Sequence, residues 1–219
     1  MARQWVKKEV RRDPLVSFAT GVERFVKEKT QTALYIAGAV VAALIFAGIL
    51  LSAHIKNRDS AYASLLRAGT NIFSNPDYAL SLCDKLLSEK QHSADTHALA
   101  RYIKGDALFV KEDYEGAFEM YSAARDRLAK DLIPDVIYAQ GKSKESLGQF
   151  NEAISFYQEF IADHDSHHLA PEVYLSMARI FAVTGNQQQA AVYAELVKGR
   201  AQGSKWAQYA DDLLPKTEK

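Results

Sequence analysis

Several features that would mark common classes of function are missing from this chain. A single cysteine, Cys83, excludes an intramolecular disulfide framework. There is no Asn-x-Ser/Thr sequon, no glycine-rich phosphate loop, no His-Glu-x-x-His motif and no Gly-x-Ser-x-Gly motif. The 27 basic and 27 acidic residues cancel, so the overall charge does not favour nucleic acid. We therefore expect a binding protein rather than an enzyme, with no cofactor and no nucleic-acid partner.

Charge is also missing from one long stretch, residues 33–53, which reads ALYIAGAVVAALIFAGILLSA. At about 1.5 Å of rise per residue, a helix of this length spans about 31 Å, close to the thickness of a bilayer core. Since lipid cannot satisfy backbone polar groups, an uncharged single stretch must be helical there. The alternatives are a fully buried core helix and a cleavable signal peptide. The run is too long for a signal peptide and has no A-x-A-like end, so we expect a retained transmembrane helix.

Small residues recur at four-residue spacing inside the span, as in Gly38 with Ala42 and Gly48 with Ser52. Such a face lets helix backbones approach closely. It makes self-association through the transmembrane helix a further hypothesis.

The charges on the two sides of the span predict its orientation. Residues 1–32 hold eight Lys/Arg and four Asp/Glu, a net charge of +4, and the rest of the chain carries −4. The positive-inside rule then places the N-terminus in the cytoplasm and the long C-terminal part outside. The missing sequons favour a bacterial periplasm over a eukaryotic lumen, so we predict a single-pass protein of the bacterial inner membrane.

The arm at residues 1–32 contains an amphipathic stretch. Asp13 and Pro14 resemble a helix N-cap and its first residue. Apolar side chains then recur every three or four residues, at Leu15, Phe18, Val22, Phe25 and Val26. This pattern is typical of a helix lying on an anionic leaflet, which makes the lipid bilayer a partner. The alternative is a continuation of the transmembrane helix whose apolar stripe packs on another protein.

The region at residues 54–219 contains internal repeats with helical periodicity and no period-two strand pattern. Four residues of one copy recur 36 positions later: Gly105, Tyr114, Ala117 and Tyr121 align with Gly141, Phe150, Ala153 and Tyr157. A third copy follows at an offset of 37, with Gly185 and Ala190. A degenerate earlier copy places Ala79 38 residues before Ala117.

These repeats resemble the tetratricopeptide repeat (TPR) family. The segment 147–157, LGQFNEAISFY, is similar to the family's L-G-x-[FY]-x-x-A-x-x-x-[FY] core, and 111–121, KEDYEGAFEMY, has Glu112 where Gly is usual. The resemblance implies an all-α solenoid of about three to four helix pairs, closed by a cap helix over residues 206–214 before Pro215. Gly148 and Gly185 should end first helices in a left-handed conformation, and Pro134 and Pro171 should begin new pairs.

In the TPR family the inner face of the solenoid comes from the first helix of each pair. Carried onto this sequence, the predicted partner-binding groove consists of Tyr102, Asp106, Phe109, Tyr138, Lys142, Glu145, Leu175 and Arg179. Aromatic anchors beside isolated charges suit protein capture. The alternative is that Tyr102 and Tyr138 only pack between helices.

Histidines offer one candidate metal site, at His164, His167 and His168 in the segment 163–168, DHDSHH. Zinc binds such side chains, but no cysteine accompanies them and the segment falls between two repeats. We therefore predict a polar turn and no metal. His92 and His97 are assigned to a loop, and Cys83, at the repeat position of Tyr121, to a small buried side chain.

The layout of basic arm, single span and repeats resembles the ancillary Sec-translocon subunit (YfgM-like) family of bacterial inner membranes. This resemblance implies a scaffold for interactions with envelope proteins such as the translocon or periplasmic chaperones. The alternative is a structural subunit of a large cell-envelope complex.

Overall fold

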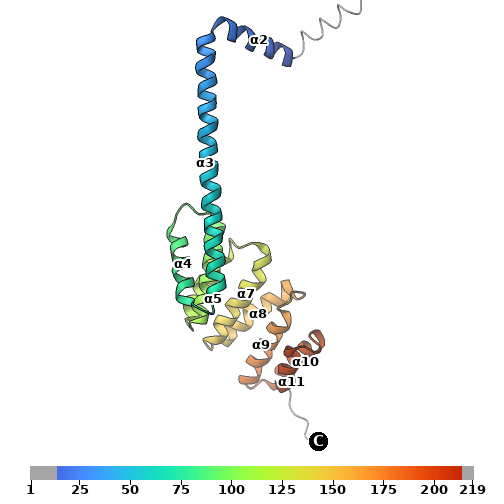
Figure 1. The fold of residues 1–219 in the computed structure, drawn as a ribbon. Coiled ribbons are helices and arrows are strands. Elements are labelled where there is room, and N and C mark those ends of the chain that lie inside the picture. Colours follow the sequence, from blue (N-terminus) through green and yellow to red (C-terminus); the bar gives the residue numbers. More distant parts are fainter. Residues whose placement is uncertain (1–13, 214–219) are drawn as a thin grey trace, which may run out of the picture. The chain divides into compact units, whose positions relative to one another are not determined.

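The computed structural model describes residues 14–213, which form ten α-helices and one short 3-10 helix, with no strand in that range (Figure 1). The prediction of an all-helical fold is confirmed for this part of the chain. Predictions for Asp13, Leu214 and Pro215 lie outside the described residues. The chain divides into two compact units, 1–57 and 58–219, which are described separately below.

The first unit contains α2 (Pro14–Glu28) and most of α3 (Thr30–Asn71). Lys29 interrupts the helix between them. Residues 33–53 are helical throughout, and α3 is long and apolar enough to cross a membrane. The large apolar side chains of this stretch, from Leu34 to Leu51, are exposed. A buried core helix would enclose these side chains, so the exposure fits a helix solvated by lipid.

The second unit begins inside α3, whose last turns provide the first helix of the first pair. Ala61, Leu65 and Ala68 are buried there against α4 (Pro76–Ser88) and α5 (Ala94–Val110). The next pairs are α5 with α6 (Tyr114–Arg125), α7 (Ile133–Ser146) with α8 (Phe150–His164), and α9 (Ala170–Val183) with α10 (Gln187–Arg200). The 3-10 helix η1 (Lys130–Leu132) precedes α7, and α11 (Lys205–Leu213) closes the array.

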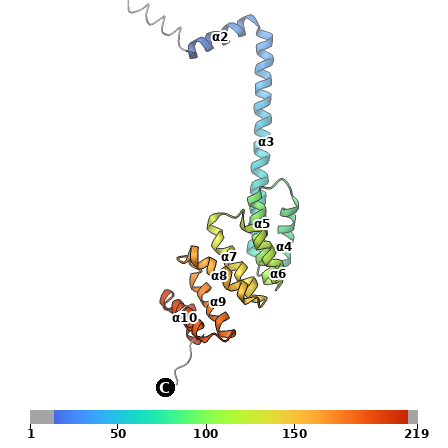
Figure 2. The same cartoon turned by 180° about the vertical axis from the view of Figure 1, so that it is seen from behind.

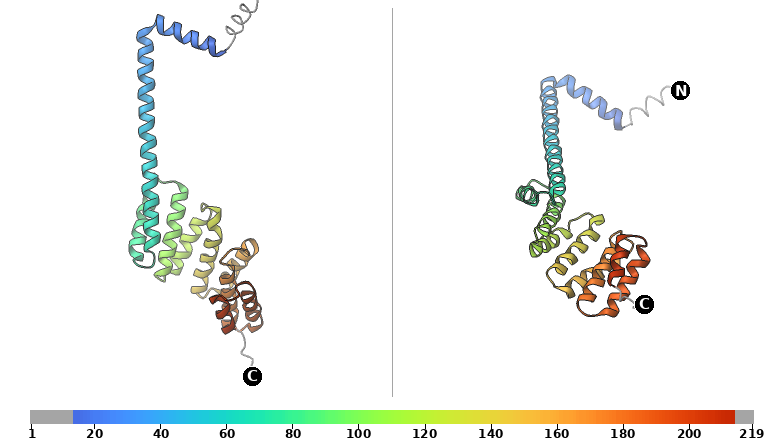
Figure 3. Two further views of the ribbon diagram at one scale, coloured as in Figure 1. Left: turned by 45° about the vertical axis from the view of Figure 1, so that its right-hand side comes forward. Right: turned by 60° about the horizontal axis from the view of Figure 1, so that its bottom comes forward.

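Consecutive pairs stack in chain order, as Figures 2 and 3 show for α4 to α11. Neither α7 nor α9 can bury its apolar face within its own pair, so each also packs against the preceding pair, α7 on α6 and α9 on α8. The largest core cluster lies in the last two pairs and includes Ile137, Tyr157, Phe160 and Met177.

In the second and third helix pairs, a glycine on the first helix faces a tyrosine ring on the second. A methyl group added at Gly105 would lie 2.6 Å from Cε1 of Tyr121, and one at Gly141 would collide in the same way with the ring of Tyr157. Both tyrosine rings are buried. These glycines are therefore required by the close approach of a ring.

Left-handed residues end the first helices of three pairs. Gly148 has φ of +73° and Gly185 has φ of +83°, as predicted. The equivalent residue of the second pair is Glu112, a non-glycine residue with φ of +64°. The following residue then caps the second helix in two of these pairs: the side chains of Asp113 and Asn186 accept from backbone N–H groups three residues on.

Replacing Glu112 by glycine should stabilise the protein, because glycine adopts the left-handed conformation without the steric cost that Cβ adds. We expect the free energy of unfolding of the 58–219 fragment to rise by about 0.5–1 kcal/mol, after the greater chain entropy of glycine is subtracted. Urea denaturation measures this. Gly148→Ala is the matched control and should lower the stability by a similar amount. A destabilising Glu112→Gly would show that the Glu112 side chain makes a contact that outweighs its strain.

Candidate functional site

Of the predicted groove residues, Tyr102 of α5 and Tyr138 of α7 each pack beside a buried tyrosine of their own helix pair. The Tyr102 ring is 5.9 Å from the Tyr121 ring, and the Tyr138 ring is 6.3 Å from that of Tyr157. The Tyr138 hydroxyl donates to Glu172 at 2.6 Å. Both tyrosines are half-buried, and burial raises the pKa of each phenol. They therefore pack between helices while keeping one edge toward the surface.

Lys142, Glu145 and Arg179 form one polar network between the third and fourth pairs. The Glu145 carboxylate accepts from the Tyr157 hydroxyl at 2.6 Å and from Lys142 Nζ at 3.0 Å, and Arg179 Nη2 lies 3.6 Å away. Arg179 also donates to Ser176 Oγ at 2.9 Å. Because Glu145 of α7 is contacted by Tyr157 of α8 and Arg179 of α9, this network fixes the stacking of the three helices.

One predicted groove residue is buried and another is only partly exposed. Leu175 is only 2% exposed, because α8, α10 and α11 all pack against α9. It belongs to the core and offers no surface for a partner. Phe109 is partly buried, with its ring 5.1 Å from that of Tyr114, and it packs against the cluster around Val136.

Three carboxylates on successive first helices lack a cationic partner. Asp106 on α5 accepts from the Tyr121 hydroxyl at 2.8 Å, and Glu172 on α9 accepts from Tyr138. Within residues 14–213, Asp135 on α7 has neither a hydrogen-bonded side-chain partner nor an ion pair, and no basic group lies within 4 Å of any of the three carboxylates. Burial is the main reason that the pKa of Asp106 is raised to about 6. The hydrogen bond from Tyr121 lowers this pKa, and the negative charge of Asp135 raises it. These three carboxylates are thus not neutralised by an ion pair with a described side chain.

Asp106→Asn should stabilise the 58–219 fragment near neutral pH. The pKa of Asp106 is about 6 in the folded state against 3.8 ordinarily, so the folded state holds this proton more tightly. The ionised carboxylate therefore costs stability progressively as pH rises from about 4 to about 6. Asparagine keeps an acceptor for Tyr121 without this cost. We expect a gain of about 1–3 kcal/mol at pH 8 that shrinks toward pH 4.

Urea denaturation across that pH range checks this expectation, with Asp126→Asn as the control for loss of an exposed carboxylate. A difference between Asp106→Asn and the parent fragment that stays constant with pH would contradict it.

An apolar depression that was not predicted from the sequence lies between α3 and α5. It has a volume of about 340 Å³ and is lined by Tyr62, Leu65, Leu66, Gly69, Thr70, Leu99 and Ile103. Leu66 is 70% exposed and Tyr62 is 49% exposed. Leu99 and Ile103 precede Asp106 on α5 by seven and three residues, so these two lining residues share a face of that helix with Asp106. The missed signal was the spacing of Tyr62, Leu65, Leu66 and Gly69 on one face of α3.

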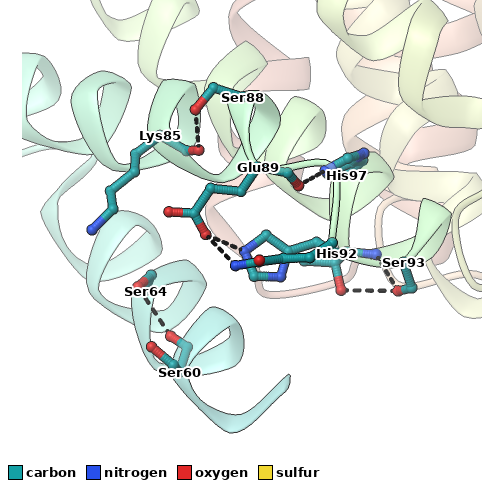
Figure 4. Close-up of polar contacts among 10 residues, drawn as sticks. Ser60, Ser64, Lys85, Ser88, Glu89, His92, Ser93 and His97 are labelled. Atoms are coloured by element: carbon teal, nitrogen blue, oxygen red, sulfur yellow. Dashed lines mark hydrogen bonds and ion pairs between the residues drawn. The ribbon is translucent and has the colours of Figure 1, made fainter. Parts of the chain in front are cut away.

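The histidines of the α4–α5 connection stabilise that turn (Figure 4). His92 Nε2 lies 2.7 Å from the Glu89 carboxylate, and the His97 ring lies 3.2 Å from the Glu89 backbone oxygen. Ser93 caps α5 by accepting from the Thr96 N–H at 3.2 Å. The assignment of His97 to a loop is wrong, because α5 begins at Ala94 and includes it. Both rings therefore hold α5 against the end of α4.

The other histidines lie at the end of α8. His164 is the last residue of that helix, and the His167 and His168 rings are 4.2 Å apart in the turn that follows. Burial and the neighbouring His168 lower the pKa of His167. Asp165 of the same turn accepts from Tyr174 and Arg200 at 2.6 and 2.7 Å. Among residues 14–213, no group of three His, Cys, Asp or Glu side chains has metal-binding geometry.

Cys83 is fully buried between α3, α4 and α5, which confirms its expected role as a small core side chain. Desolvation raises the pKa of its thiol to about 12. The thiol therefore stays protonated and unreactive at neutral pH.

The stacked helix pairs, their left-handed turn residues and their small-to-large packing define an all-helical protein of the TPR type. A solved structure described as the crystal structure of MamA is similar to it, with a TM-score of 0.56 over 71% of this chain and 88% of that one. At 20% identity this likeness shows the fold alone. The sequence matches no protein-family model and no curated protein. The likeness to the ancillary translocon-subunit family therefore stays an interpretation of the layout.

Proposed function

We propose that this chain is a membrane-anchored scaffold whose TPR-type domain binds other proteins of the cell envelope. The TPR-type fold supports protein partners in general. The apolar part of α3 supports the anchor, and the +4 and −4 charges around it support a cytoplasmic N-terminus with the repeats in the periplasm. The translocon and periplasmic chaperones are candidate partners through the resemblance in layout.

One observation carries the binding role: the apolar depression between α3 and α5 is lined by Leu99 and Ile103, which share a helix face with Asp106, a carboxylate in no ion pair among the described residues. An apolar side chain of a partner would enter the depression and remove exposed Leu66 and Tyr62 from water. A basic side chain of the partner would neutralise Asp106 and Asp135, whose negative charges interact with each other. The partner segment therefore combines apolar and basic residues.

Leu66→Arg together with Asp135→Lys should abolish most partner capture, because the pair fills the depression with a charge and reverses the local field. The full-length protein and its variant are crosslinked to their partners and purified from solubilised membranes. The partners recovered with each are then quantified by mass spectrometry. We expect recovery of specific partners to fall at least tenfold, about 1.4 kcal/mol or more.

The matched control is Val192→Arg with Asp126→Lys. Val192 is an exposed apolar residue of α10, and Asp126 is an exposed carboxylate directly after α6, so both lie at second helices and away from the depression. This control should keep the partner list intact. Equal loss in both variants, or loss in neither, would place partner binding elsewhere.

The same purification separates the two classes of role. A translocon or chaperone recovered with diverse client chains supports an interaction scaffold that assists translocation or handover. A stoichiometric set of components would instead support a structural subunit of a large envelope complex.

A further inference from the structure

Helix α2 exposes an apolar stripe that no other described feature explains. Phe18, Val22, Phe25 and Val26 are between 38% and 70% exposed. At 100° per residue they fall within one third of the helix circumference. A continuous exposed stripe of this kind in a soluble segment marks a contact surface.

The opposite face of α2 is polar and satisfies itself within the helix. The Thr20 hydroxyl donates to the backbone oxygens of Val16 and Ser17 at 2.9 and 3.0 Å, and Lys27 pairs with Glu23 at 2.6 Å. Arg24 projects from the same side of the helix wheel. The helix is therefore amphipathic: one face suits an apolar environment and the opposite face suits water.

The position of α2 in the chain fixes which apolar environment is nearest. Only Lys29 separates its last residue, Glu28, from α3, and the uncharged stretch of α3 begins four residues after Lys29. Residues 33–53 alone fill the bilayer core, and Glu23, Arg24, Lys27 and Glu28 cannot enter it at low cost. At this place α2 meets the headgroup region.

We propose that α2 lies in the plane of the membrane interface on a leaflet rich in anionic lipid, with Phe18, Val22, Phe25 and Val26 in the acyl boundary. Charge selects the lipid: residues 1–32 hold eight basic and four acidic residues, so the arm is attracted to anionic headgroups. This inference rests on the proposed anchoring of α3. It adds a second membrane contact that fixes the cytoplasmic arm against the leaflet.

Spin labels on the full chain in proteoliposomes test the orientation of α2. Single cysteines are introduced in a Cys83→Ala background at Val22 and Val26 on the apolar face and at Thr20 and Arg24 on the polar face. Accessibility to oxygen, which concentrates in lipid, is compared with accessibility to a water-soluble nickel chelate. We expect the labels at 22 and 26 to be reached by oxygen and shielded from nickel, and those at 20 and 24 to show the reverse.

A reference label at Leu44, in the middle of the apolar stretch, distinguishes a failure of the anchoring by α3 from a failure of the proposal for α2. If this label is reached by nickel, the anchoring itself fails. If it is in lipid while 22 and 26 are reached by nickel, only the proposal for α2 is overturned. Labels at 22 and 26 shielded from both reagents would mean that protein covers the stripe, which also overturns it.

The lipid preference is tested with vesicles of phosphatidylcholine alone and of phosphatidylcholine with phosphatidylglycerol. The labels at 22 and 26 should lie deeper when the anionic lipid is present, and high salt should reduce that difference. Equal depth in both vesicles would overturn the role of anionic lipid.

Discussion

Gly141→Ala is expected to destabilise the TPR-type domain by about 1–3 kcal/mol, although alanine is the better helix former. The added methyl group would collide with the buried ring of Tyr157, which hydrogen-bonds to Glu145 and so cannot simply move aside. Relief requires the two helices of the third pair to separate. Thermal and urea unfolding of the 58–219 fragment measure the loss.

Gly199→Ala is the matched control, because Gly199 is also helical but an added methyl group there has nothing within 4 Å. This variant should gain about 0.5–1 kcal/mol from the lower chain entropy of alanine. If Gly141→Ala lowers the free energy of unfolding while Gly199→Ala raises it, the loss at Gly141 is due to the collision with the Tyr157 ring. A neutral or stabilising Gly141→Ala would show that the crossing of α7 and α8 is looser than the structure indicates.

Val41→Asp with Leu44→Asp should remove the protein from the membrane. Both side chains are exposed in the middle of the uncharged stretch of α3. Each carboxylate at the centre of a transmembrane helix costs about 2.5–3.5 kcal/mol on insertion, so the pair costs about 5–7 kcal/mol. We expect the double variant to be lost from the carbonate-resistant membrane fraction and recovered in the soluble fraction.

Ser60→Asp with Ala63→Asp is the control for that experiment. It places the same charges at the same spacing on exposed positions of the same helix, outside the uncharged stretch. The control protein should remain in the membrane. Retention of the Val41→Asp, Leu44→Asp protein in the carbonate-resistant fraction would show that lipid does not surround this part of α3.

The helix pairs could be predicted because their signals are local or recur at a fixed interval. Gly141 and Tyr157 repeat Gly105 and Tyr121 exactly 36 residues apart, and the structure places each glycine against its ring. The role of Gly148 and Gly185 in ending first helices could be predicted because glycine readily adopts the left-handed conformation, and their φ values are positive as expected.

Properties that depend on neighbouring helices could not be predicted from the repeats. Leu175 occupies the repeat position of Tyr138 but is buried, because helices on three sides pack against α9. The apolar depression joins Leu66 of α3 to Leu99 and Ile103 of α5, and only the tertiary packing brings these side chains together. The first helix of the first pair could not be predicted either. It is the end of α3, so no N-cap marks where it begins.

The central claim is that α3 anchors the chain with its repeats outside the cytoplasm, and reporter fusions test it most directly. Alkaline phosphatase, which is active only outside the cytoplasm, and a fluorescent protein, which is fluorescent only inside it, are each fused after Lys219 and produced in a bacterial host. We expect an active phosphatase and a dark fluorescent fusion, both in the membrane fraction. A bright fluorescent fusion with an inactive phosphatase would contradict it.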